Sequence, residues 1–167
     1  MSNYMKISCF DTANGSGIGT VLWMSGCNHN CEGCHNPETH DPKAGKKFDC
    51  STLEELMESL NNPHIKRLTL SGGDPLFPDN RGASTLIAKV FKLTYPNKKL
   101  WVYTGYRFEQ LKDLDILESI DVLVDGPFIL DKKDISLPFC GSSNQRVIDV
   151  PKTLKAGHVV LWEDLYA

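Results

Sequence analysis

Apolar runs and polar breaks alternate along the chain in a way that predicts strands separated by helices. Short apolar runs bounded by small or polar residues are typical of buried strands. They cover residues 20–24, 65–70, 99–103 and 121–124. Apolar residues at helical spacing predict helices between the strands, over about residues 51–60, 82–93 and 108–119. Strands that recur roughly every 30 residues with helices between them are typical of βα units on a parallel sheet.

Other segments give weaker signals. Residues 5–10 alternate weakly between apolar and polar, which predicts a short edge strand. Ser51 or Thr52 can cap the first helix, because their hydroxyl groups accept from free backbone N–H groups. After residue 125 we expect a long loop, a strand and an apolar stretch, over residues 128–138, 144–150 and 158–162.

The length of the chain limits the α/β fold that this pattern can build. A closed barrel of eight βα units needs about 250 residues, and the chain has 167. We therefore expect a partial, open βα barrel with a parallel sheet, formed by a single domain over residues 1–167. Its core is expected over about residues 5–150, with residues 151–167 as a C-terminal extension.

Composition and charge limit the classes of binding partner that we expect. The chain is 41% hydrophobic and has a formal net charge of -3, without a dense Lys/Arg block. This charge distribution does not predict the basic surface that a nucleic-acid-binding protein needs. No apolar run approaches the roughly 20 residues of a membrane span, and the first residues lack a secretory apolar region. We expect a cytoplasmic protein that binds neither nucleic acid nor membrane.

Cys27, Cys31 and Cys34 form a C-x3-C-x2-C array in a polar loop that follows the first buried strand. Three thiolates in one loop can hold an iron–sulfur cluster or a metal ion. A cubane cluster has four iron corners, so three thiolates leave one iron open to a substrate or cofactor. The pattern therefore favours chemistry at a cluster over simple electron transfer.

The spacing of these cysteines disfavours two other uses. A structural zinc site would need a fourth ligand such as His29, His35 or another cysteine, but zinc sites usually contain C-x2-C pairs, and only one is present. Disulfides are disfavoured, because three of the six cysteines crowd into one loop and no secretory segment is present. The remaining thiols, at Cys9, Cys50 and Cys140, are expected to be incidental.

The loops that follow the predicted strands are rich in small or acidic residues. In parallel βα architectures the carboxyl ends of the strands form the binding site. The cysteine loop, residues 71–75, residues 104–105 and residues 125–126 should therefore face one another. Asp125 and Thr104, at strand ends, could touch a cofactor or cation. His40, His64 and His158 are expected to be ordinary polar positions.

The cysteine loop, followed by a Gly-Gly-Asp-Pro loop after the next strand, resembles the radical S-adenosylmethionine superfamily. Further blocks resemble the activating proteins of anaerobic ribonucleoside-triphosphate reductases. They cover residues 71–76, 101–106, 121–128 and 141–146, and the whole resemblance runs over about residues 7–150.

The resemblance implies a radical S-adenosylmethionine oxidoreductase that activates a glycyl-radical enzyme. It implies a [4Fe–4S] cluster on Cys27, Cys31 and Cys34, with S-adenosylmethionine on the open iron. An electron from the reduced cluster cleaves the cofactor to methionine and a 5′-deoxyadenosyl radical, which takes a hydrogen from a backbone glycine of the large reductase subunit. Reduction needs a partner such as flavodoxin. No side chain is expected to act as a catalytic acid or base, because cluster and cofactor carry the chemistry.

The resemblance also implies cofactor-binding residues, which are Gly33, Cys34, His35, Gly72, Gly73 and Asp74. The first three lie where adenine and ribose should pass, although the family often has an aromatic residue at His35. Gly72 and Gly73 let the backbone approach the methionine moiety without a Cβ clash. Asp74, or a carbonyl near it, could accept from the ammonium group.

Alternative functions predict different behaviour. An activase of another glycyl-radical enzyme, such as pyruvate formate-lyase, would associate with that enzyme instead. A ferredoxin-like electron carrier would hold a cluster that S-adenosylmethionine does not affect. A zinc-stabilised interaction module would contain zinc and no iron.

Overall fold

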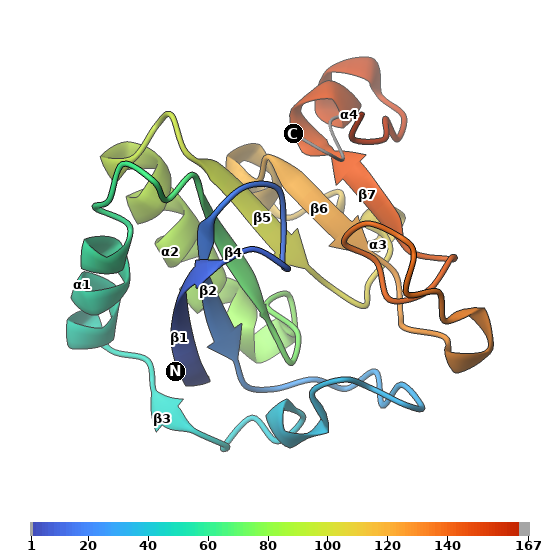
Figure 1. The fold of residues 1–167 in the computed structure, drawn as a ribbon, viewed down its shortest axis with the longest axis horizontal. Helices are drawn as coiled ribbons and strands as arrows, with labels where there is room; N and C mark the ends of the chain where they lie inside the picture. Colours follow the sequence, from blue (N-terminus) through green and yellow to red (C-terminus); the bar gives the residue numbers. More distant parts are fainter. Residues whose placement is uncertain (1, 164–167) are drawn as a thin grey trace.

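The computed structural model describes residues 2–163, and within them seven strands form one open sheet in the order β3-β1-β2-β4-β5-β6-β7 (Figure 1). The neighbours at its centre run parallel. They are β2 (Gly19–Met24), β4 (Arg67–Gly72), β5 (Lys99–Tyr103) and β6 (Val122–Asp125). The outer strands pair antiparallel. They are β1 (Asn3–Asp11), β3 (Lys46–Lys47) and β7 (Arg146–Asp149).

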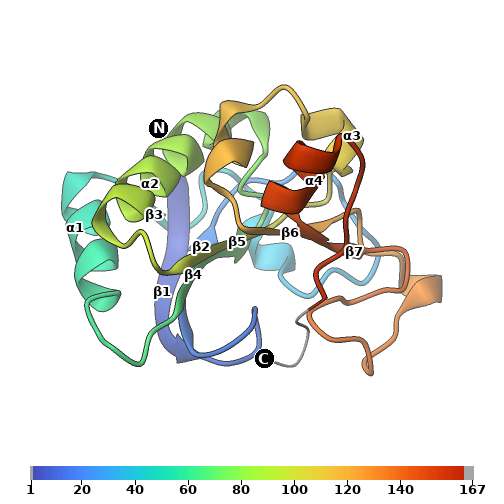
Figure 2. The same ribbon diagram turned by 90° about the horizontal axis from the view of Figure 1, so that it is seen from above.

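Helices cover one face of this sheet, as Figure 2 shows for α1, α2 and α4. The helices are α1 (Cys50–Ser59), α2 (Arg81–Thr94), α3 (Phe108–Leu111) and α4 (Val150–Ala156). None of the described helices is long and apolar enough to cross a membrane.

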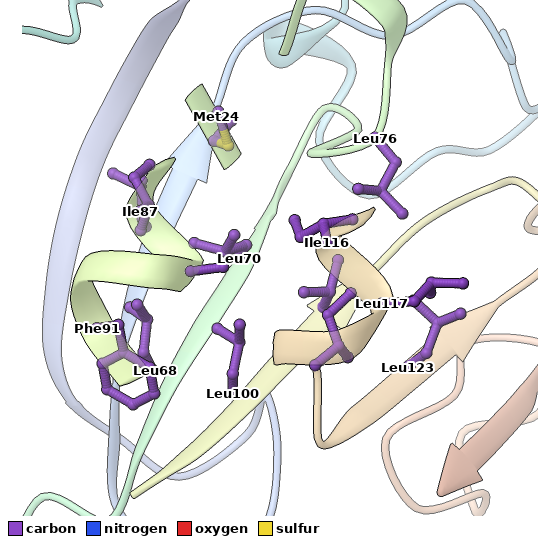
Figure 3. Packing of buried hydrophobic residues seen from close by; sticks show 14 of the residues in the cluster. Met24, Leu68, Leu70, Leu76, Ile87, Phe91, Leu100, Ile116, Leu117 and Leu123 are labelled. Atoms are coloured by element: carbon purple, nitrogen blue, oxygen red, sulfur yellow. The ribbon is translucent and has the colours of Figure 1, made fainter. Parts of the chain in front are cut away.

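The main hydrophobic core lies between the sheet and these helices (Figure 3). Leu68 and Leu70 of β4 are fully buried there with Phe91 of α2. Alternate side chains of a strand point to opposite faces, so Arg67 and Thr69 lie on the other face of β4. The two faces therefore differ in chemistry: one is apolar and packed on helices. The other, which we call the polar face, carries Arg67 and Thr69 beside a smaller hydrophobic cluster under loops.

The prediction of a parallel sheet is confirmed for its centre and wrong for its margins. β1 returns antiparallel to β2, and β3 pairs on its outer side, so β1 is not the edge strand expected for residues 5–10. A weakly alternating strand does not reveal its direction, because the direction is set by the connection that leads out of it. Here residues 12–18 form a short turn rather than a helical crossover.

α1 starts earlier than its hydroxyl residues suggested. The N-cap is Asp49, whose Oδ1 accepts from the Thr52 backbone N–H at 2.9 Å. Ser51 and Thr52 lie inside the first turn. A carboxylate cap suits the positive end of the helix dipole, which explains why Asp49 takes this position.

The single helix expected over residues 108–119 is wrong, because the segment breaks in two. α3 ends at Leu111, and a 3-10 helix follows at Asp115–Ser119. Between them Leu114 has an extended backbone, with φ -88° and ψ 126°. This break brings Ile116 and Leu117 of the second piece into the core together.

The described end of the chain lies along β7. The Asp149 N–H donates to the Val160 carbonyl at 2.9 Å, and the Trp162 N–H donates to the Val147 carbonyl at 2.8 Å. Trp162 packs edge-on against Trp101 of β5, with ring centroids 6.0 Å apart. Trp162 thus packs on the polar face of the sheet, whereas α4 of the same C-terminal extension lies on the helix-covered face. Residues 164–167 of the extension lie outside the described residues.

Candidate functional site

A cavity of about 140 Å³ lies at the carboxyl ends of the parallel strands. Cys27, Cys31 and Cys34 line it from the loop after β2. Its other walls come from the loops after β4, β5 and β6, through Gly72, Gly73, Thr104, Gly105 and Gly126. The expectation that these four loops face one another is confirmed.

The cysteine loop folds back on itself. Gly33 has a φ of 73°, a conformation that favours glycine, and the Cys34 N–H donates to the Cys31 carbonyl at 3.2 Å. The returning segment then pairs with the start of the loop, since the Gly26 N–H donates to Thr39 and the Cys27 N–H donates to His40. The three thiols are therefore held in a loop that is closed by its own backbone.

The thiols suit a cluster that displaces their protons. Burial raises the pKa of the Cys27 thiol to about 11, and the nearby Asp74 carboxylate adds to this rise. A cluster or metal must therefore remove a proton from Cys27 as it binds. Within residues 2–163 no three His, Cys, Asp or Glu side chains converge closely enough to hold one metal ion. Thiolates of a four-iron cubane bind different irons, so the donor set fits the cluster without such convergence.

Gly72 and Gly73 line the cavity, and a side chain at either position would clash with neighbouring backbone atoms. Gly72 has a φ of 104°, and a Cβ there would lie 2.5 Å from the Met24 carbonyl oxygen. A Cβ on Gly73 would lie 2.6 Å from the carbonyl oxygen of Gly26. These glycines therefore allow the loop after β4 to lie directly against the start of the cysteine loop.

Asp74 lies behind the cavity and joins three of its loops. Its carboxylate accepts from Thr104 Oγ1 at 2.9 and 3.0 Å, from the Gly105 N–H at 2.9 Å and from the Leu76 N–H at 2.8 Å. His29 Nε2 lies 2.6 Å from Asp74 Oδ2. We call His29, Asp74, Thr104 and Gly105 the Asp74 network. Asp74 is fully buried, so its carboxylate connects loops instead of facing the cavity as expected for a contact with an ammonium group.

His29 is fixed on three sides. Besides Asp74, its ring meets Tyr106 edge-on with centroids 4.5 Å apart. It also lies on Gly105, where a Cβ would come within 2.4 Å of the imidazole. Because His29 stands between Cys27 and Cys31 in the sequence, these contacts orient the cysteine loop.

His35 lies in the wall of the cavity, and Gly33 does not. His35 lines the cavity and packs on Phe128, with ring centroids 5.0 Å apart. Gly33 lies on the outside of the turn, where a Cβ would meet Leu130 at 3.0 Å. A second cavity of about 320 Å³ shares His35, Phe128 and Tyr103 with the first, so the space continues over the polar face of the sheet.

Asp125 does not face the cavity. It is fully buried and binds Arg146, with Nε donating to Oδ1 at 3.0 Å. Its other oxygen accepts from the Phe108 N–H at 2.8 Å. The structure thus places Asp125 in a structural ion pair, while Thr104, the other strand-end residue considered, lines the cavity.

Sequence reasoning missed several residues of the cavity wall, namely His40, Tyr103, Phe128 and Gln145. His40 was expected to be an ordinary polar position, yet its Nε2 lies 3.3 Å from Cys34 Sγ. Its spacing of six residues from Cys34 matches no ligand motif, so the sequence offered no signal. Tyr103, Phe128 and Gln145 do fall in the blocks that carried the family resemblance.

Known proteins match most of the chain. The family model described as a 4Fe-4S single cluster domain matches residues 13–148. The anaerobic ribonucleoside-triphosphate reductase-activating protein of Enterobacteria phage T4 is 40% identical over 87% of this chain and 92% of its own length. Proteins with the same description in Escherichia coli K12 and Pasteurella multocida are 39% and 42% identical, over 97% and 94% of their lengths.

Proposed function

Because this chain belongs to the family of anaerobic ribonucleoside-triphosphate reductase-activating proteins, we propose that it generates a glycyl radical on such a reductase. When bound, a reduced [4Fe–4S] cluster supplies the electron that cleaves S-adenosylmethionine and so drives hydrogen abstraction from a glycine of the reductase. The chain itself binds the cluster, orients the cofactor and excludes water.

One observation carries this proposal. Three thiols of a single loop line the same cavity as the loops after β4, β5 and β6. Three protein thiolates leave a fourth iron for a cofactor, and the cavity wall opposite them is made largely of small residues. A cofactor bound at that iron would lie across the ends of the parallel strands, where α/β proteins bind their ligands.

The residues have separate roles in this proposal. Cys27, Cys31 and Cys34 hold the cluster. Gly72 and Gly73 present their backbone to the methionine moiety. Cys34 and His35 lie on the side of adenine and ribose, where the His35 ring faces Phe128. Gly33 acts through the turn that positions Cys34. No side chain serves as an acid or base.

The role of Asp74 is indirect. Its carboxylate oxygens are occupied by donors from the cysteine loop and the loops after β4 and β5. It therefore fixes the spacing between the thiols and the Gly72–Gly73 backbone. Backbone carbonyls of the loop after β4, rather than the Asp74 side chain, accept from the ammonium group of the cofactor.

The proposal extends to fold and partners. Residues 1–167 form a single domain, with a radical-SAM-like partial barrel over about residues 5–150 and a C-terminal extension. The open sheet and the continuous cavities over its polar face support this arrangement. The partners are the large subunit of the reductase and an electron donor such as flavodoxin, in the cytoplasm.

An anaerobic assay with a cysteine variant tests the function. Wild-type protein is reconstituted with iron and sulfide, reduced, and examined by EPR with and without S-adenosylmethionine, while 5′-deoxyadenosine is measured. We expect the cofactor to change the signal and 5′-deoxyadenosine to form. Cys31→Ala should abolish the stable cluster and all cleavage, because two thiolates cannot hold the cubane.

Cys9→Ala is the matched control, since Cys9 is an exposed thiol on β1 and should leave cluster and cleavage unchanged. Full activity of Cys31→Ala would contradict the cluster assignment. A signal unaffected by the cofactor would favour an electron carrier, and zinc without iron would favour an interaction module. Incubation with either glycyl-radical enzyme, followed by EPR, separates a reductase activase from a pyruvate formate-lyase activase.

A further inference from the structure

The imidazole of His40 lies within hydrogen-bond distance of one of the three cysteine sulfurs. Its Nε2 lies 3.3 Å from Cys34 Sγ, and both residues line the cavity. Among the described residues, His40 provides the side-chain hydrogen bond to a sulfur of Cys27, Cys31 or Cys34. The hydrogen bond to Cys27 comes instead from a backbone group, the His29 N–H. The bond to Cys34 is therefore the one that a substitution can remove without disturbing the main chain of the loop.

The backbone holds His40 firmly in this place. The 3-10 helix Pro37–Thr39 ends at His40, whose N–H donates to the Pro37 carbonyl at 3.2 Å. The His40 carbonyl accepts from the Cys27 N–H at 3.1 Å. Thr39, next to it, is buried and accepts from Gly26. His40 is thus tied to the first cysteine through its backbone and to the third through its side chain.

The direction of this hydrogen bond follows from the chemistry of the sulfur. A thiolate bound to iron carries no proton and can only accept, so Nε2 must be the donor. A donor to a ligating sulfur draws charge away from it and favours the reduced, more negative state of the cluster.

We propose that His40 sets the reduction potential of the cluster by donating a hydrogen bond from Nε2 to the Cys34 thiolate. It acts through Cys34, so it is a positioning residue rather than a catalytic one. The inference rests on the proposed function, because it needs the cluster on Cys27, Cys31 and Cys34. It adds that the chain itself makes this cluster easier to reduce.

The test measures the midpoint potential of the reconstituted protein by EPR-monitored redox titration without S-adenosylmethionine. In His40→Leu the potential should become more negative. Losing a hydrogen bond to a charged group should lower the ratio of reduced to oxidised cluster at a fixed potential roughly tenfold. For a one-electron couple that is a shift of ~59 mV.

Two variants sharpen the result. In His40→Gln the side-chain amide nitrogen can occupy the place of Nε2, so the potential should return towards that of the wild type. His64→Leu, at an exposed histidine in the turn before β4, should leave the potential unchanged. Equal potentials in wild type and His40→Leu would overturn the proposal, as would a shift that His40→Gln does not reduce.

A second measurement needs no variant to fold. Wild-type protein containing ring-15N histidine should show a 15N hyperfine coupling to the reduced cluster, because the donor nitrogen lies against a ligating sulfur. The label is confined to the ring, so the His29 backbone nitrogen does not contribute. The His29 ring binds Asp74 instead, and the His35 ring packs on Phe128, so a coupling that His40→Gln retains without a ring nitrogen at position 40 would also contradict the proposal. Absence of the coupling would overturn the proposal even if His40→Leu loses its cluster.

These outcomes are distinct from failure of the proposed function. A wild-type protein that holds a cluster but does not cleave S-adenosylmethionine contradicts the activase role, while the potentials of His40→Leu and His40→Gln still decide the role of His40. A wild-type protein that cleaves the cofactor, with an unchanged potential in His40→Leu, contradicts only the role of His40.

Discussion

β4 has a buried charge near each end, and the surroundings of the two charges differ. Arg67 opens the strand and Asp74 follows it, and both are fully buried. Arg67 donates to Thr69 Oγ1 at 2.7 Å and to Asp11 Oδ1 at 2.7 Å. We call Asp11, Arg67 and Thr69 the Arg67 network. It lines neither of the two connected cavities, whereas Thr104 and Gly105 of the Asp74 network line the first one.

Burial of a charge does not distinguish the two networks, whereas their position relative to the cavities does. The Arg67 network closes the amino end of the sheet, where Gly15 and Gly19 lie so close to the guanidinium that a Cβ on Gly19 would come within 2.4 Å of it. The Asp74 network gathers donors from loops at the carboxyl end, where parallel sheets bind ligands. We expect the first network to govern stability alone and the second to govern cofactor binding as well.

The largest expected effect is on stability, from Asp11→Ala. Arginine stays charged in proteins, so loss of Asp11 leaves a buried charge without its carboxylate. Breaking a buried ion pair in this way costs about 3–5 kcal/mol of unfolding free energy. Urea denaturation followed by circular dichroism measures the change.

The control is Asp113→Ala, at an exposed carboxylate, which should change stability by no more than about 0.5 kcal/mol. Folded Asp11→Ala should bind S-adenosylmethionine as the wild type does. Weaker binding would show that the Arg67 network reaches the site, and the contrast between the two networks would then fail.

An intermediate effect is expected from Asp74→Asn, which keeps the shape of the side chain but replaces one acceptor oxygen by a donor group. The new N–H₂ must face either Thr104 and Leu76 or His29 and Gly105, all of which donate to Asp74 now. Hydrogen bonds to a charged group contribute about 1.5–3 kcal/mol, so we expect roughly 10- to 100-fold weaker binding of S-adenosylmethionine. Titration of the cofactor-induced EPR change measures it.

Asp121→Asn is the matched control at the other end of the sheet. Asp121 is also buried and accepts from a backbone N–H, that of Leu100, at 2.7 Å. It should lower stability without weakening cofactor binding. Equal losses of affinity in Asp74→Asn and Asp121→Asn would mean that general destabilisation, and not the Asp74 network, explains the effect.

The smallest expected effects come from a pair of nearly isosteric substitutions, Thr69→Val and Thr104→Val. Each removes one hydroxyl group, from the Arg67 network and the Asp74 network respectively. Each should lower the unfolding free energy by roughly 0.5–1.5 kcal/mol. Affinity for S-adenosylmethionine should fall in Thr104→Val and stay constant in Thr69→Val, and the reverse order would contradict the assignment.

Much of the fold could be predicted because it depends on local patterns. The strand over residues 99–103 matches β5, and the helix over residues 82–93 lies within α2. One error occurred where a longer-range contact decided the outcome, since Leu114 interrupts the helix expected over residues 108–119 so that two neighbouring apolar residues reach the core. Another error was local, because Asp49 caps α1 through a hydrogen bond to Thr52 in the same turn, in place of Ser51 or Thr52.

The candidate site could also be predicted only in part. Family resemblance in the sequence brought together the cysteine loop and the Gly-Gly-Asp-Pro loop, and the structure places both at one cavity. It did not reveal that Asp74 faces His29 and Thr104, or that His40 faces Cys34. Cluster ligation and cofactor contacts at these residues stay predictions that the experiments above address.

By itself, the sequence determined the three thiols, the small-residue loops and the alternation of strands and helices. Each of these depends only on the spacing of residues that are close together in the chain. Tertiary structure alone decided which polar groups meet. His29 and Asp74 are 45 positions apart, and Arg67 and Asp11 are 56 apart. Such pairs form only after strand order and direction are set, because a buried charge must find its partner among groups that the packed sheet brings within reach.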